Sequence, residues 1–205
     1  MVTPIAGRVR IQGVSSAARH VHHSYADYLS LEDESSTRHE YLDGEIYAMA
    51  GGTPDHAALA AAAIRILGNG LPRGCRVFTS DLRVRVVESG LSTYPDAAVI
   101  CGKTLRAADD SIAVVNPVLL VEVTSPSTED YDRAEKLRHY KQLPTLREVL
   151  IISHREPRVT LVRRQEDGAW SSTDLRGGQS LSLASLGLGI AVDDIYRGGL
   201  EDSDA

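Results

Sequence analysis

The apolar run around residue 120 is the strongest structural signal in the chain. Residues 118–121 are all apolar, and Val123 follows after a single acid, Glu122, with proline-containing pairs at both ends of the run. A continuous apolar run between turn residues is typical of a strand that is covered on both faces within an α/β sheet. The alternation of side chains along a strand places Leu119, Val121 and Val123 on one face and Glu122 on the other.

Weaker patterns on either side of this run predict the remaining elements. Capping residues and helical periodicity predict helices that begin at Tyr25, at Pro54 (ending near Leu67) and near residue 130 (ending before Pro144). Strands are expected on both sides of the Asp43-Gly44 turn and over residues 75–87, 92–101, 118–124, 148–153, 158–164 and 170–174, with a last strand or turn within 180–196. This order predicts an α/β (mixed α+β) fold with a central mixed β-sheet flanked by helices.

The organisation of the chain is predicted to be simple. Residues 1–22 lack a clear period and are expected to be disordered, and residues 198–205 form an acidic tail. No internal repeat or linker divides residues 23–197, so we expect one domain there. Its length is sufficient for one sizeable core within the 205-residue chain.

One strand carries a regular alternation of arginines. Leu82, Val84 and Val86 are predicted to face inward, and Arg83 and Arg85 outward. An antiparallel strand with one solvated face is the simplest interpretation. The arginines would also serve as phosphate contacts if that face bordered a cleft. Residues 102–116, farther along, are expected to form a surface loop.

Two acids stand where buried residues are expected. Glu122 interrupts the apolar run, and Asp96 lies within a second β-prone stretch, residues 92–101. A buried carboxylate costs several kcal/mol unless it is protonated, paired or bound to a metal. Glu122 is therefore either a satisfied polar residue near a strand end or part of a site. Two adjacent strands that each offer a carboxylate would form a hard-oxygen site for Mg²⁺ or Mn²⁺, as phosphodiester hydrolysis requires.

Composition sets limits on function and location. The formal net charge of −6 opposes non-specific nucleic-acid binding, so a nucleic-acid ligand would require a local basic patch or an oligomer. Cys75 and Cys101 are interpreted as free core thiols, which predicts a cytoplasmic protein. No apolar run approaches the roughly 18 residues needed to cross a membrane, so no membrane association is expected.

Several motifs in fixed order resemble a known family. They are His39–Gly51, Asp55-His56, Tyr94-Pro95-Asp96, Val121–Thr128 and the spaced residues Asp132, Lys136 and Tyr140. This set, over roughly residues 24–172, resembles the Uma-type family of restriction-type endonucleases within the PD-(D/E)XK nuclease superfamily. The resemblance implies a restriction-endonuclease-like core and metal-dependent hydrolysis of phosphodiester bonds in DNA.

The resemblance also implies roles for individual residues. Asp96 and Glu122 would bind Mg²⁺ or Mn²⁺ together with the backbone carbonyl of Val123. Glu40 matches a family acid that would assist catalysis, although an exposed strand residue is the alternative. His56, at a helix start, is either a phosphate or base contact or a histidine held by its neighbours.

The sequence departs from the superfamily pattern at Thr124. The superfamily has a lysine two residues after the second acid, and threonine cannot place a positive charge there. The family likeness implies that Lys136, on the next helix, replaces that charge. Two rival functions follow if it does not: a catalytically inactive nucleic-acid-binding protein, or an assembly protein with internally paired carboxylates. The Ala-rich helix at 54–67 and the net charge suggest a homodimer that pools its basic residues.

Overall fold

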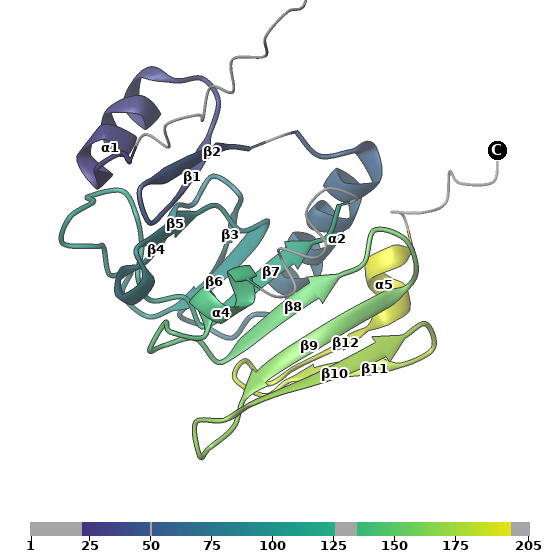
Figure 1. Cartoon of the computed structure of the whole chain (residues 1–205). Coiled ribbons are helices and arrows are strands. Elements are labelled where there is room, and N and C mark those ends of the chain that lie inside the picture. The colour runs from purple at the N-terminus through teal and green to yellow at the C-terminus, as the bar shows by residue number, and fades with distance from the viewer. Residues whose placement is uncertain (1–21, 50, 126–134, 198–205) are drawn as a thin grey trace, which may run out of the picture.

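The computed structural model describes residues 22–49, 51–125 and 135–197 (Figure 1). Its helices are α1 (Tyr25–Glu34), α2 (Pro54–Gly70), the 3-10 turn η1 (Val87–Ser89), α4 (Leu137–Tyr140) and α5 (Val192–Tyr196). Its strands are β1 (His39–Leu42), β2 (Glu45–Ala48), β3 (Cys75–Thr79), β4 (Val84–Val86), β5 (Leu91–Thr93), β6 (Ala97–Cys101), β7 (Leu119–Val123), β8 (Glu148–Ile152), β9 (Arg158–Arg164), β10 (Trp170–Arg176), β11 (Ser180–Leu183) and β12 (Leu188–Ala191).

A six-stranded sheet of order β10-β9-β8-β7-β6-β3 forms the centre of the molecule. β7 pairs in parallel with β8 and antiparallel with β6, so the sheet is mixed. Every residue of β7 is buried, as its uninterrupted apolar sequence predicts. The predicted mixed sheet flanked by helices is confirmed.

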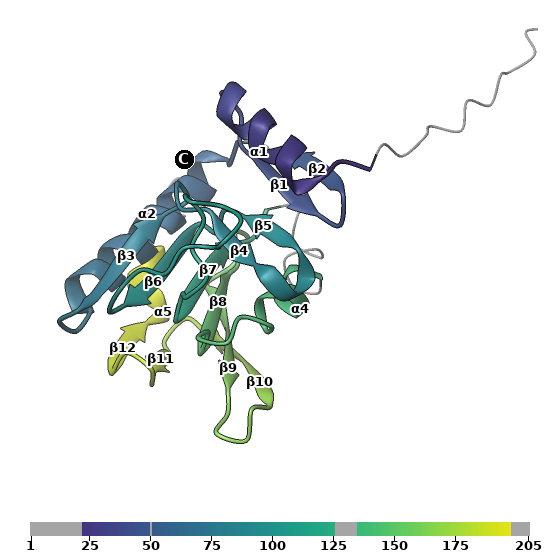
Figure 2. The ribbon, with the colours of Figure 1, turned by 90° about the vertical axis from the view of Figure 1, so that its left-hand side faces the viewer.

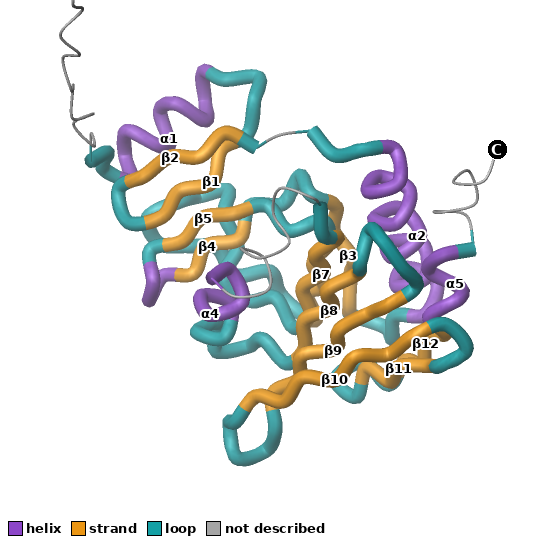
Figure 3. The backbone as a smooth tube through the Cα atoms, turned by 45° about the vertical axis from the view of Figure 1, so that its right-hand side comes forward, coloured by secondary structure: helices purple, strands orange, loops and turns teal. Residues whose placement is uncertain are grey.

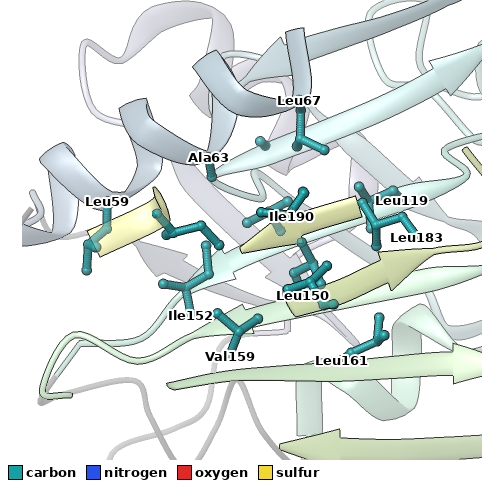
Figure 4. Packing of buried hydrophobic residues seen from close by; sticks show 14 of the residues in the cluster. Leu59, Ala63, Leu67, Leu119, Leu150, Ile152, Val159, Leu161, Leu183 and Ile190 are labelled. Atoms are coloured by element: carbon teal, nitrogen blue, oxygen red, sulfur yellow. The ribbon is translucent and has the colours of Figure 1, made fainter. Parts of the chain in front are cut away.

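The central sheet is covered on both faces. In a turned view α1 and the β1–β2 hairpin stand at the top of the molecule (Figure 2), and a third view shows the smaller sheet on one side of the central sheet with α2 and α5 on the other (Figure 3). Leu59 of α2 and Leu119 of β7 belong to one core cluster (Figure 4). Val121 of β7 and Ile195 of α5 belong to the same cluster. Leu120, from the opposite face of β7, belongs to the second cluster. The predicted alternation along β7 is thus observed in the packing.

The smaller sheet, of order β2-β1-β5-β4, begins with the predicted hairpin. Asp43 and Gly44 both have positive φ, 47° and 86°. Two consecutive residues with positive φ are required by the type I′ turn, whose twist matches that of the flanking strands. This turn aligns β1 so that Tyr41 pairs with Ser92 of β5, which brings the start of the hairpin beside the segment leading to Asp96.

The prediction of a solvated arginine face is wrong. Arg83 and Arg85 are only 5% and 7% exposed. Arg83 forms ion pairs with Asp110 (2.8 Å) and Glu32 (3.4 Å), and Arg85 with Asp109 (3.2 Å). Both guanidinium groups are buried and paired with acids of the same chain, so the condition for their predicted role as phosphate contacts, a solvated face, is not met.

Residues 102–116 are more than the expected surface loop. Val114 bridges to both Val84 and Arg106, and Ala113 and Val114 are buried. The loop therefore covers the arginine side of β4. The arginines are therefore shielded from solvent, because Asp109 and Asp110 of the loop pair with them.

The prediction of two free thiols is also wrong. Cys75 and Cys101 form a disulfide across a separation of 26 residues. They stand directly opposite each other in the β3–β6 ladder, a long-range pairing that spacing in the sequence does not reveal. Closing a loop of this length contributes about 3.5 kcal/mol in the chain-entropy model. The cytoplasmic location that free thiols implied loses that support.

Some predictions concern residues outside the described ranges. The disordered segment at 1–22 (apart from His22), the acidic tail at 198–205, and Asp132 with the first part of the predicted helix at 130–142 lie there. The described part of the chain contains no helix that is both long and apolar enough to cross a bilayer.

Candidate active site

Lys136 lies between two carboxylates at the carboxyl end of β7. Its Nζ is 2.8 Å from Oε1 of Glu40 and 3.3 Å from Oε1 of Glu122. Lys136 and Glu122 are each 5% exposed. Buried charges are tolerated when they are paired, and Lys136 pairs with both carboxylates.

Two hydroxyl groups complete this arrangement. The hydroxyl of Tyr140 donates to Oε1 of Glu122, and that of Thr93 donates to Oε1 of Glu40. Burial, followed by the charge of Glu122, raises the pKa of Tyr140 well above its ordinary value. Tyr140 therefore remains a hydrogen-bond donor throughout the neutral range.

Local structure explains how these residues meet. Lys136 and Tyr140 are four residues apart, so one helical turn presents both to the same neighbour. The pairing of Tyr41 with Ser92 in the β1–β5 ladder, extended by one residue, places Glu40 opposite Thr93. The site thus combines β1, β5, β7 and the start of α4.

Asp96 lies on the neighbouring strand, beside the residue that follows Glu122. The β6–β7 register pairs Ala97 with Val121, so one further step places Asp96 opposite Glu122. Oδ2 of Asp96 accepts a hydrogen bond from the Val123 amide (2.7 Å) and lies 3.3 Å from Nε2 of His56. His56 is thus held by a neighbour, and its contact with a phosphate or a base stays a prediction.

These residues suit a hard divalent cation. Carboxylates are the preferred ligands of Mg²⁺, which often takes one or two of them and keeps several waters. Both contacts of Asp96 within the described ranges use Oδ2, which leaves Oδ1 for a cation. Glu40 and Glu122 share one ammonium group, and Asp96 lies opposite Glu122, so carboxylates outnumber the ammonium group among these four residues. Among the described residues, no group of three or more acids, histidines or cysteines is arranged so that it could hold a metal ion. Asp96, Glu122 and the Val123 carbonyl therefore stay the predicted ligands of such an ion.

Thr124, the departure from the superfamily pattern, is fully buried. Its Oγ1 lies 2.8 Å from Nδ1 of His154 and accepts from the His154 amide at 3.2 Å. Nε of Arg155 donates to Nε2 of His154 (3.2 Å), which assigns the proton to Nδ1 and makes Thr124 the acceptor. His154 thus holds the threonine that stands in place of the usual lysine.

Comparison with known proteins identifies the family. A model of the family described as "Uma2: Putative restriction endonuclease" matches residues 25–193. The chain belongs to this family. The family resemblance found in the sequence is confirmed.

Relatives of this Uma2 family protein occur in cyanobacteria. The "Uncharacterized protein slr1290" of Synechocystis is 38% identical over 173 residues, which are 84% of this chain and 90% of that protein. A second Synechocystis protein, sll1609, is 33% identical over 153 residues, covering 74% and 86%. A crystal structure from Anabaena variabilis, described as "a putative nuclease belonging to DUF820", has a TM-score of 0.68 and 20% identity, covering 84% of this chain and 96% of that one. That likeness establishes the shared fold.

Sequence reasoning identified most of the residues that meet in this Uma2 family site. Lys136 contacts both Glu40 and Glu122, Tyr140 donates to Glu122, and Asp96 lies opposite Glu122. Thr93 and His154 were missed. His154 had a usable signal, because it follows the strand at 148–152, and the carboxyl ends of adjacent parallel strands meet at one sheet edge.

Proposed function

We propose that the chain is a divalent-metal-dependent endonuclease that hydrolyses phosphodiester bonds in DNA. The observation that carries this proposal is the placement of Lys136 between Glu40 and Glu122, with Asp96 opposite Glu122 on the next strand. Membership of a family described as restriction endonucleases supports it. A buried lysine held by two acids beside a third carboxylate suits a reaction that needs both a cation site and a fixed positive charge.

In this proposal Asp96, Glu122 and the Val123 carbonyl hold Mg²⁺ or Mn²⁺. When bound, the metal supplies a Lewis acid that activates water and stabilises the charge developing on phosphorus. Tyr140 fixes the orientation of the Glu122 carboxylate through its hydrogen bond. The Val123 amide fixes Asp96 in the same way.

Lys136 supplies the preorganised positive charge that Thr124 lacks. Its ammonium group is held by Glu40, which is itself held by Thr93. Glu40 therefore assists by positioning Lys136 towards the phosphate. A fixed charge in a site with little water acts more strongly on a transition state than a solvated lysine does.

Cleavage assays with purified protein test this proposal. DNA and RNA substrates should be compared with Mg²⁺, with Mn²⁺ and with a chelator. We expect metal-dependent cleavage of DNA that is lost in Asp96→Asn, which keeps an acceptor for the Val123 amide but removes the charge. Asp33→Asn, which alters an exposed acid of α1, is the matched control and should cleave normally.

Failure would take distinguishable forms. A protein that binds Mn²⁺ and DNA but never cleaves would be a nucleic-acid-binding descendant of a nuclease. A protein that binds neither would support an assembly role with internally paired carboxylates. Cleavage by Asp96→Asn at the wild-type rate would refute the assignment of Asp96.

We also propose that the protein is a homodimer. Leu59, Ala63 and Leu67 of α2 face the core, whereas Ala57 and Ala61 are exposed, and small side chains permit close approach of a second copy. Light scattering at tens of micromolar protein should therefore give the mass of a dimer. A monomer mass at that concentration would contradict the proposal.

A further inference from the structure

The single tryptophan of the chain lies between two cationic side chains. Trp170 is the first residue of β10 and pairs with Arg164 of β9. Cζ of Arg164 is 5.9 Å from the centre of the indole ring, and Nζ of Lys141 is 6.0 Å from it. Cation–π contacts of this kind hold long side chains in place and lower the entropy lost when they bind a ligand.

Arg147 extends this group of positive charges. Its carbonyl accepts a hydrogen bond from the Arg164 amide at 2.8 Å, and its own side chain is exposed. Arg164 is braced by a 3.1 Å hydrogen bond to the carbonyl of Pro144. We call Lys141, Arg147, Arg164 and Trp170 the basic patch.

The acids near the basic patch do not neutralise it. Glu148 is 1% exposed and accepts hydrogen bonds from Arg163 and from the amide and hydroxyl of Ser185. Its charge is therefore satisfied away from the patch. Glu166 and Asp167, in the adjoining turn, form no ion pair with the patch in the described part of the chain. A cavity of about 360 Å³ borders Arg147 and Arg164, so both have open space beside them.

The basic patch and the candidate active site share one face of the central sheet. Trp170 packs against the core cluster that contains Leu120 and Tyr140. Glu122 alternates with Leu120 in the same direction along β7. α4 connects the two regions, because it carries Lys136 and Tyr140 at the site and leads directly into Lys141. Figure 2 shows α4 between the smaller sheet and the β9–β10 hairpin.

The distance between the basic patch and the candidate active site can be estimated along β7. The Arg147 amide donates to the Val118 carbonyl at 2.9 Å, four residues before Glu122. At roughly 3.3 Å per residue this is about 13 Å. One strand of duplex DNA advances about 3.4 Å along the axis per nucleotide, so about four nucleotides cover this distance.

We propose that the basic patch binds the phosphate backbone of the nucleic acid, about four nucleotides from the bond that is cleaved. The inference rests on the proposed function and names the surface that holds its substrate. It also explains how a chain of net charge −6 engages a polyanion. Local cations fixed around an aromatic ring supply the attraction that the overall charge opposes.

Binding without cleavage tests the inference. The variants are made in the Asp96→Asn background and titrated with a fluorescent 20-base-pair duplex over a range of salt concentrations. The double variant Lys141→Gln with Arg147→Gln removes two charges of the basic patch. It leaves Arg164, which donates a hydrogen bond to the Pro144 carbonyl, in place. We expect the slope of log affinity against log salt to become shallower by about one per charge removed, with affinity at 0.1 M salt lowered roughly eightfold per charge.

The matched control removes two exposed arginines elsewhere, by Arg65→Gln with Arg73→Gln. It should bind with nearly the wild-type slope, because α2 covers the opposite face of the sheet. Trp170 gives a second readout, since the emission of a single tryptophan should change when DNA binds and should be lost in Trp170→Phe. Equal slopes for both double variants, or no change in Trp170 emission at saturation, would overturn the inference.

The two proposals fail separately. If the wild-type chain cleaves DNA and the patch variant binds DNA normally, the proposed role of the basic patch is wrong and the nuclease assignment stands. If DNA binds through the patch but no metal supports cleavage, the patch stands and the nuclease assignment fails.

Discussion

Replacing Lys136 by alanine should slow DNA cleavage by about 10²–10³-fold while metal binding persists, because one preorganised charge at the transition state is lost. Nζ of Lys136 reaches both Glu40 and Glu122, so no solvated side chain can take its place. Single-turnover cleavage assays measure the rate, and calorimetric titration with Mn²⁺ measures the metal. Glu122→Ala should lose both DNA cleavage and metal binding.

A loss of folding must be distinguished from a loss of chemistry. Without Lys136, two buried carboxylates lack their cation, which destabilises the protein unless they protonate or bind metal. Circular dichroism and thermal unfolding of Lys136→Ala, with and without Mn²⁺, therefore accompany the assay. Lys103→Ala, which alters an exposed lysine, is the control. Wild-type cleavage by a folded Lys136→Ala protein would refute the assignment of Lys136.

A rescue experiment at position 124 tests whether a lysine there can place its ammonium group where that of Lys136 lies. Thr124→Lys in the Lys136→Ala background restores the charge at the superfamily position. The threonine is buried and bonded to His154, so the new lysine must displace that imidazole. Thr124→Val in the same background measures the cost of losing the hydrogen bond alone. Recovery with lysine but not with valine would show that the two positions are equivalent.

The parts of the fold that local patterns determine were predictable. β7 is specified by a continuous apolar run and the β1–β2 turn by Asp43-Gly44, and both signals span only a few residues. Lys136 and Tyr140 reach Glu122 because one helical turn follows the strand closely. Prediction of the Asp96–Glu122 pair required the assumption that two β-prone stretches are neighbours in the sheet. The β6–β7 ladder confirms that they are.

The parts that failed depend on contacts between distant segments. The alternation of Arg83 and Arg85 was identified correctly, but its interpretation required knowledge that Asp110 and Asp109 cover that face. The disulfide between Cys75 and Cys101 could not be predicted without knowledge of the β3–β6 register. Thr93 contacts Glu40 across 53 residues. Periodicity describes which residues share a face and does not say what covers that face.

Arg83→Met should lower the free energy of unfolding by about 3–5 kcal/mol, because it leaves buried acids without their cation. The guanidinium pairs with Asp110 and Glu32, whose side chains are 2% and 3% exposed, and its Nε donates to the Tyr94 hydroxyl. Despite burial, hydrogen bonds from Arg83 and from two backbone amides lower the pKa of Asp110. For a domain of this size, each kcal/mol shifts the melting temperature by about 2–4 °C, so calorimetry will resolve the effect. Arg65→Met, on the exposed face of α2, should change stability by less than about 0.5 kcal/mol.

The pH dependence and a double-mutant cycle identify the cause. Because the pKa of Asp110 is lower in the folded chain, its contribution to stability is fully present above its unfolded value near 4 and is lost as the pH falls through the folded value. The difference between wild type and Arg83→Met should therefore shrink in acid. Adding Asp110→Asn to Arg83→Met should cost much less than the sum of the two single changes, since the pair is removed together. Strict additivity, or a wild-type melting temperature for Arg83→Met, would show that this buried network does not stabilise the fold. A non-additive result would show that Arg83 and Asp110 stabilise the fold as a coupled pair, within the network in which Arg83 also donates to the hydroxyl of Tyr94, two residues before Asp96.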